Sequence, residues 1–246
     1  MRLLLVSNSQ CFGHQYLEHA EQAVKDQFDG LDGNGIAFVP FAVHDQRAYG
    51  QRVGARFNDL GLSVTTVTPD EKGVALLSRS GGIFVGGGNT FRLLNLLRRH
   101  NMVSLIQKRV RAGTPYMGSS AGSGIAAPTI KTSNDMPIVA PQDLGGLGFE
   151  SLGLVDYQLN LHYIDTDPDS THMGETRQQR LEEYLEDNQT PVVALREGAW
   201  IEVAGEVHRV GGQTGGLVFQ RGGEPKPLVA GDELRWSNAL TLEVIR

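Results

Sequence analysis

Residues 115–127 read PYMGSSAGSGIAA, a short apolar run followed by a cluster of small residues. The run 115–118 has the length and hydrophobicity of a buried strand, and the small residues 121–127 indicate the start of a helix. Between them, residues 118–122 spell G-x-S-x-G, the pattern of a tight turn that holds a serine above the edge of a sheet. The flanking glycines let backbone and substrate come close to that serine. This stretch predicts a strand, a nucleophile elbow and a helix in succession.

Apolar runs alternate with helical patterns on both sides of this stretch. The predicted buried strands are residues 3–7, 36–41, 63–67, 82–85 and 115–118. The predicted helices are residues 14–28, 46–60, 70–78, 90–99 and 103–112. Such alternation implies right-handed crossovers onto a mostly parallel sheet flanked by helices, so the fold class is α/β.

The pattern changes in the second half of the chain. Residues 136–139, 155–161 and 191–195 are predicted as strands, and residues 174–186 as a charged helix. From residue 199 to 246, short alternating runs separated by glycine-rich turns predict antiparallel hairpins appended to one edge of the sheet. Because no linker or repeat divides the chain, we expect residues 1–246 to form a single domain.

Composition excludes several classes of function. The 246 residues are 40% hydrophobic and 20% charged, as in an ordinary globular chain. Cys11 is the only cysteine, which excludes an internal disulfide and a thiolate metal cluster and fits a reducing compartment. No apolar run approaches the roughly 18 residues of a membrane span, and a net charge of −6 argues against a nucleic-acid partner. We therefore expect a cytoplasmic protein without membrane or nucleic-acid partners.

A histidine stands near the end of another predicted strand. Residues 155–163 read VDYQLNLHY and place His162 where α/β sheets carry their chemistry. A neutral imidazole within reach of the serine hydroxyl could take its proton during attack and return it to a leaving amine. The other histidines are scattered without metal-ligand spacing, so we expect no metal.

Several blocks together carry a family resemblance that extends to about residue 232. In order they are LLLVSNSQ, FVPFA, FVGGGNTFRLL, YMGSSAGSGIA, TSNDMPIV, LNLHY, GETRQQRL and PVVALREGAWI. They resemble peptidase E, a family of α-aspartyl dipeptidases with cyanophycinases as more distant relatives. The resemblance implies a cytoplasmic serine peptidase that cleaves small acidic dipeptides with an N-terminal aspartate and needs no cofactor. It also implies a flavodoxin-like fold related to class I glutamine amidotransferases, in a monomer or homodimer.

The same resemblance assigns a catalytic pair and leaves its acid open. The family's nucleophile falls on Ser120 and its histidine on His162. Either Asp135 or Glu197 could orient the imidazole, and we favour Asp135 with Glu197 close behind. The alternative is that Asp135 forms a turn and Glu197 is a solvated loop charge. Since Cys11 lies far from the elbow, the nucleophile must be an oxygen.

The tetrahedral intermediate needs two converging N–H donors. The candidates are the amide of Ala121, directly after the nucleophile, and that of Gly88 in the loop GGGNT. A glycine loop could instead cradle a phosphate. This loop lacks both the Lys-Ser/Thr of a P-loop and the spacing of a dinucleotide site, so no nucleotide is expected.

An acidic substrate also needs positive charge or hydrogen-bond donors. Arg177 is the candidate for binding the substrate carboxylate, because a guanidinium binds a carboxylate bidentately. Asn89, Thr132 and Ser133 are further candidate donors. The alternatives are that Asn89 caps the helix after it and that Thr132 and Ser133 satisfy turn amides.

One position departs from the family pattern. Relatives often carry tryptophan where this chain has Ser119, which we expect to open space beside the nucleophile. Two adjacent hydroxyls then occupy the elbow, of which Ser120 is central in the motif. Two other functions remain open: a cyanophycinase-like β-aspartyl exopeptidase, and a relative that binds aspartate without turnover.

Overall fold

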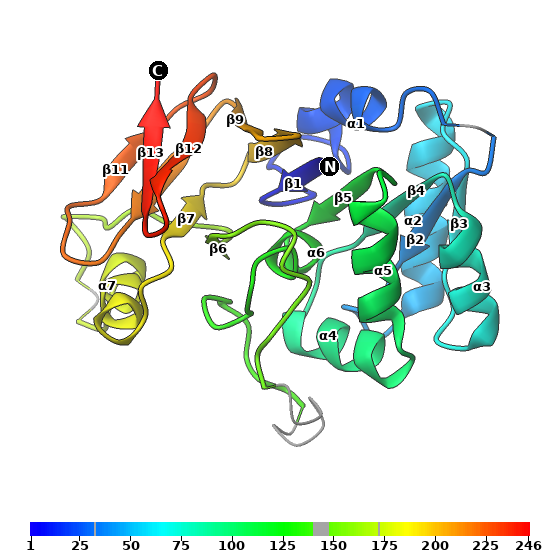
Figure 1. The fold of residues 1–246 in the computed structure, drawn as a ribbon, viewed down its shortest axis with the longest axis horizontal. Helices are drawn as coiled ribbons and strands as arrows, with labels where there is room; N and C mark the ends of the chain where they lie inside the picture. Colours follow the sequence, from blue (N-terminus) through cyan, green and yellow to red (C-terminus); the bar gives the residue numbers. More distant parts are fainter. Residues whose placement is uncertain (32, 140–147, 172) are drawn as a thin grey trace.

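The computed structural model describes residues 1–31, 33–139, 148–171 and 173–246. Its larger sheet has the strand order β13-β12-β9-β8-β1-β5-β4-β2-β3. The parallel half consists of β1 (Arg2–Val6), β5 (Tyr116–Ser119), β4 (Gly82–Val85), β2 (Ile36–Val39) and β3 (Val64–Thr66). The antiparallel half consists of β8 (Ala199–Ala204), β9 (Val207–Gly212), β12 (Glu233–Asn238) and β13 (Thr241–Ile245). This arrangement confirms the predicted α/β class (Figure 1).

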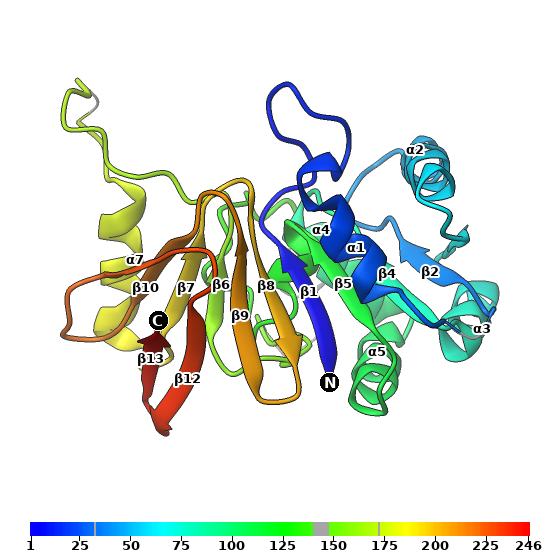
Figure 2. The same cartoon turned by 90° about the horizontal axis from the view of Figure 1, so that it is seen from above.

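Helices cover both faces of the parallel strands. The helices are α1 (Glu21–Gln27), α2 (Gln46–Asp59), α3 (Glu71–Arg79), α4 (Thr90–Arg99) and α5 (Met102–Arg111). Figure 2 shows α1 and α2 on one side of the sheet and α3 and α5 on the other. Strand β1 contributes to both layers, because successive side chains of a strand point to opposite faces of the sheet. Leu4 packs in the hydrophobic core under α1 and α2, whereas Leu3 and Leu5 pack in the core on the opposite face.

A second sheet stands beside the first. Its strand order is β11 (Lys226–Leu228), β10 (Gly216–Phe219), β7 (Val192–Leu195) and β6 (Gln158–Asn160). Helix α7 (Arg177–Asp187) packs Leu181 and Leu185 against this sheet, at the opposite end of the molecule from α2 and α3 (Figure 1). The predicted hairpins therefore divide between two places, since β8, β9, β12 and β13 extend the larger sheet while β10 and β11 join the smaller one.

Three predicted elements differ from the structure. Residues 136–139 form no strand, because Pro137 cannot donate a ladder hydrogen bond and Met136 is exposed. The first predicted helix begins late, since Leu17 has a φ of 56° before the short 3-10 turn Glu18–Ala20 and helix α1. The strand predicted at 155–161 shortens to β6. Within the described residues, no helix is long and apolar enough to cross a membrane.

Candidate active site

Ser120 stands at the turn between β5 and the short helix α6 (Ala121–Gly124). Its φ of 52° and ψ of −118° are unusual for a residue with a side chain, and such strain is typical of a nucleophile elbow. The Ser120 amide donates to the carbonyl of Val6 at 3.0 Å, which holds the turn against the end of β1. The neighbouring Ser119 is fully buried and does not line the pocket beside Ser120.

Two glycines of the motif are required because neighbouring backbone lies where their side chains would be. A Cβ on Gly118 would lie 2.5 Å from the backbone of Gly122, and one on Gly122 would lie 2.0 Å from the carbonyl oxygen of Val85. The hydroxyl of Tyr116 also donates to the carbonyl of Gly122 at 2.6 Å. Close packing of α6 on β4 and β5 is thus the physical reason for small residues in this stretch.

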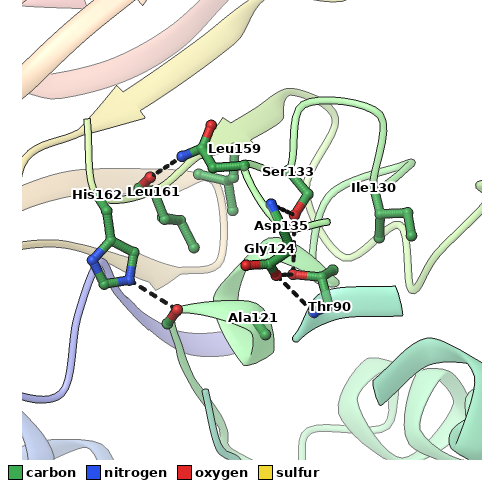
Figure 3. Close-up of a pocket in the computed structure, with 11 residues that line it drawn as sticks. Thr90, Ala121, Gly124, Ile130, Ser133, Asp135, Leu159, Leu161 and His162 are labelled. Carbon is green, nitrogen blue, oxygen red and sulfur yellow. Dashed lines mark hydrogen bonds between the residues drawn. The ribbon is translucent and has the colours of Figure 1, made fainter. Parts of the chain in front are cut away.

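His162 lies two residues beyond the end of β6 and reaches the elbow. Its Nε2 lies 2.9 Å from Ser120 Oγ (Figure 3). His162 also has a positive φ, 53°. Ser7 holds it there, because the Ser7 hydroxyl accepts from the His162 amide at 3.0 Å and donates to the carbonyl of Leu195 at 3.0 Å. The side chain that directly follows β1 therefore connects the segment after β6 to the last residue of β7.

Glu197 is the carboxylate that contacts the imidazole. Its Oε1 lies 2.7 Å from His162 Nδ1. Since a carboxylate only accepts, Nδ1 carries the proton and Nε2 is free to accept from Ser120. The loop is held by Asn8 Oδ1, which accepts from the Gly198 amide at 2.8 Å, and by Thr214 Oγ1, which donates to the Glu197 carbonyl at 2.7 Å. The two side chains are partly open to solvent, with 40% of the His162 surface and 58% of the Glu197 surface exposed.

The preference for Asp135 as the acid of the triad is wrong on this geometry. Asp135 turns to the N-terminus of α4, where one oxygen, Oδ2, accepts from the amide of Thr90 at 2.7 Å and from its hydroxyl. The free amides at a helix start attract a carboxylate, which explains this orientation. Glu197 reaches His162 because β6 and β7 are parallel neighbours and end at the same edge.

The glycine loop after β4 packs against the elbow. A Cβ on Gly87 would lie 2.8 Å from the Cβ of Ser120, so the loop can approach this closely only without a side chain. The Gly87 amide donates to the hydroxyl of Tyr49 at 3.0 Å. The amides of Gly88 and Ala121, the two predicted oxyanion donors, have no acceptor in the part of the chain that the structure describes. Both remain available to a bound oxyanion.

A small pocket opens beside Ser120 and His162. Its lining comes from the elbow, the start of α4, the segment before Met136 and the end of β6 (Figure 3). The lining residues are Thr90, Ser120, Ala121, Gly124, Ile130, Ser133, Asn134, Asp135, Leu159, Leu161 and His162. Ser133 is the one predicted substrate-binding residue in this set.

The other predicted donors are used within the protein. Asn89 caps α4, because its Oδ1 accepts from the Arg92 amide at 3.0 Å while its Nδ2 donates to the Met136 carbonyl at 2.8 Å. The hydroxyl of Thr132 is buried and donates to the carbonyl of Leu159 at 3.0 Å. Neither side chain lines the pocket beside Ser120.

Arg177 lies apart from Ser120 in this structure. It begins α7 and lines a different pocket, together with the segment 164–168. Burial, followed by the nearby charge of Arg180, lowers the pKa of Arg177. Arg177 is separated from Ser120 because it is the first residue of α7, and the apolar face of α7 packs on the smaller sheet. The structure therefore does not bring Arg177 to the pocket beside Ser120.

Some supporting residues were not predicted from the sequence. Ser7 and Asn8 directly follow the first strand, and polar residues at that position could have indicated them. Arg196 precedes Glu197 and binds Asp165 through two hydrogen bonds of 2.6 and 2.7 Å. This pair joins the loop of Glu197 to the segment after His162, and it holds the pKa of Asp165 below its ordinary value.

Fold and site together define a class of protein. A serine on an α/β elbow, paired with an imidazole that a carboxylate orients, is the arrangement of a serine hydrolase. The profile of peptidase family S51 matches residues 3–211, and this chain belongs to that family of serine peptidases.

Curated relatives extend over nearly the whole chain. A protein named peptidase E from Streptomyces coelicolor is 46% identical over 234 residues, which cover 95% of this chain and 93% of that protein. A protein named probable alpha-aspartyl dipeptidase from Drosophila melanogaster is 38% identical over 227 residues, which cover 92% of each chain. The family predicted from the sequence blocks is thereby confirmed.

Solved structures show the same fold at lower identity. A putative peptidase E from Listeria monocytogenes matches with a TM-score of 0.64 and 23% identity, covering 87% of this chain and 98% of that one. A peptidase from an acI-B1 Actinobacterium matches with a TM-score of 0.69 and 17% identity, covering 96% of both chains. These similarities support the fold.

Proposed function

We propose that this protein is a dipeptidase that hydrolyses dipeptides with an N-terminal aspartate. The observation that carries the proposal is the continuous chain of contacts Ser120, His162 and Glu197 in a member of family S51. The aspartate preference rests on the names of relatives that match this chain along almost its full length. The lone cysteine fits a reducing compartment, so we also propose a cytoplasmic location.

The reaction follows from the positions of these groups. Ser120 Oγ attacks the carbonyl carbon of the first residue and gives its proton to His162 Nε2. The carbonyl oxygen becomes an oxyanion that accepts from the amides of Ala121 and Gly88. Glu197 stabilises the imidazolium that forms between the two transfers.

Collapse of the intermediate completes the first half of the reaction. The C–N bond breaks, and the leaving amine of the second residue takes the proton from His162. An ester between Ser120 and the first residue remains. A water molecule then gives a proton to His162 Nε2 and attacks the ester carbon. The second collapse returns that proton to Ser120 and releases free aspartate.

The test compares four dipeptides with wild-type protein and two variants. We expect wild type to cleave Asp-Leu and to leave Glu-Leu, Ala-Leu and β-Asp-Leu largely intact. Ser120→Ala removes the nucleophile and should lower kcat by about 10³-fold or more. Ser119→Ala is the matched control, because its hydroxyl is buried outside the pocket and its loss leaves the nucleophile in place.

Other outcomes would replace the proposal. Preferential cleavage of β-Asp-Leu would favour a cyanophycinase-like exopeptidase. Binding of aspartate without hydrolysis of any dipeptide would indicate a relative that has lost turnover. Loss of activity in Ser119→Ala with retention in Ser120→Ala would mean that the nucleophile is assigned to the wrong hydroxyl.

A further inference from the structure

We propose that Asp135 binds the free α-ammonium group of the substrate's first residue and thereby restricts cleavage to the first peptide bond. This inference rests on the proposed dipeptidase function and adds a subsite to it. Asp135 becomes a specificity-determining residue that contacts the substrate, distinct from the acid that orients His162.

The orientation of the carboxylate is the first observation. Among the residues that the structure describes, the Asp135 carboxylate accepts from the amide and the hydroxyl of Thr90, and both bonds end on the same oxygen, Oδ2. The other oxygen points into the pocket, away from Thr90 (Figure 3). It has no donor among the residues that the structure describes. A role in capping α4 accounts for one oxygen and leaves the second free for a ligand.

The charge of the pocket is the second observation. Asp135 is the one carboxylate among the described residues that line it, and neither lysine nor arginine is in that set. Nearby polar groups are already paired: Ser133 Oγ contacts the hydroxyl of Thr90 at 3.2 Å, and Asn134 Nδ2 donates to the carbonyl of Leu161 at 2.6 Å. A pocket with an unpaired anionic oxygen and no Lys or Arg favours a cationic group of the substrate.

The carboxylate of Asp135 and the nucleophile share one pocket, which links the negative charge to the choice of the bond that is cleaved. Ser120 and Asp135 line the same small cavity. In a peptide with a free N-terminus, the α-ammonium is two covalent bonds from the carbonyl carbon that Ser120 attacks. An ammonium held by Asp135 therefore places the first peptide bond, rather than a later one, at the nucleophile. An N-terminal extension of the substrate would replace the ammonium by a neutral amide.

The test uses two substrates that differ by one group. Asp-Leu and succinyl-leucine share the carboxylate, the scissile amide and the leaving leucine, but succinyl-leucine lacks the amine. Leucine release by wild type should show kcat/KM about 10- to 100-fold higher for Asp-Leu, as expected for one charge-assisted hydrogen bond. Asp135→Asn keeps the shape and an acceptor for Thr90, and should lower kcat/KM for Asp-Leu by a similar factor while changing succinyl-leucine by less than about threefold.

A control separates binding from capping. Thr90→Ala removes the hydroxyl contact to Asp135 but keeps its carboxylate, so the ratio between the two substrates should stay near that of wild type. Equal losses on both substrates in Asp135→Asn would show a structural role and overturn the inference. Equal rates of wild type on both substrates would overturn it as well.

A measurement on wild type alone covers the case in which Asp135→Asn does not fold. Aspartate and succinate differ by the same amine, and aspartate should inhibit competitively with a Ki about 10- to 100-fold lower. Equal inhibition would contradict the inference. Failure of the proposed function is distinguishable: if wild type prefers Ala-Leu, the aspartate preference is wrong, and the pair Ala-Leu and propionyl-leucine tests Asp135 independently.

Discussion

Replacing Glu197 by glutamine should reduce turnover without unfolding the protein. The substitution keeps the length and an acceptor oxygen near His162 Nδ1, where the carboxylate now lies at 2.7 Å. It removes the negative charge that stabilises the imidazolium between proton transfers. The side chains of Asn8 and Thr214 hold the loop by hydrogen bonds to its backbone, and these bonds do not involve the Glu197 side chain.

The size of the effect follows from exposure. A hydrogen bond to a charged group contributes about 1.5–3 kcal/mol, or roughly 10- to 150-fold in rate. Because 58% of the Glu197 side chain and 40% of His162 are exposed, water screens this pair and the lower part of that range applies. We therefore expect kcat to fall by about 10- to 30-fold, far less than the roughly 10⁴-fold loss known for a buried triad acid.

The assay measures kcat and KM for Asp-Leu and succinyl-leucine in wild type, Glu197→Gln and Glu206→Gln. Glu206 is exposed in the turn after β8, so its variant controls for the change in net charge. Glu197→Gln should lower kcat equally on both substrates, because the imidazole serves both. Full activity in Glu197→Gln would refute the assignment of this residue to the triad.

Three further predictions concern packing, the glycine loop and pH. Gly122→Ala places a Cβ 2.0 Å from a backbone oxygen of β4. It should lower the free energy of unfolding, measured in urea, by about 1–3 kcal/mol. Gly124→Ala is the control and should change that free energy little, because the nearest atom to its Cβ lies at 3.8 Å. Tyr49→Phe removes the hydroxyl that accepts from the buried amide of Gly87 at 3.0 Å. The free energy of unfolding should fall by about 1–3 kcal/mol, and kcat should fall because the glycine loop is displaced. Unchanged kcat and stability would contradict this prediction. Burial lowers the pKa of His208 below 6.5, so the unfolded chain binds the proton more readily; its contribution to stability is present above pH 6.5 and declines as the pH falls below it. Thermal unfolding of His208→Gln should show a smaller loss of stability than wild type on going from pH 7 to pH 5, and an identical loss would exclude this residue as the cause.

The sequence predicted those parts of the fold that depend on local pattern. The strand, turn and helix around Ser120 follow from apolar and small residues in immediate succession, and the helix after Asn89 follows from its capping residue. The division of strands between two sheets could not be predicted, because β7 and β10 have the same apolar character as strands of the larger sheet. Which sheet a strand joins depends on contacts between distant residues that a local pattern does not contain.

The choice between Asp135 and Glu197 shows the same limit at the level of one contact. Both carboxylates lie in polar loops, and the sequence alone does not show which of them reaches the imidazole. In the folded protein the distance to His162 depends on strand pairing: β6 and β7 are parallel neighbours and end together, while Asp135 is attracted to the free amides at the start of α4. Asp135 therefore bonds to the start of α4 rather than to the imidazole, and its carboxylate lines the substrate pocket. We therefore expect removal of the Glu197 carboxylate to slow every substrate alike, and removal of the Asp135 carboxylate to slow selectively the substrates that have a free amine.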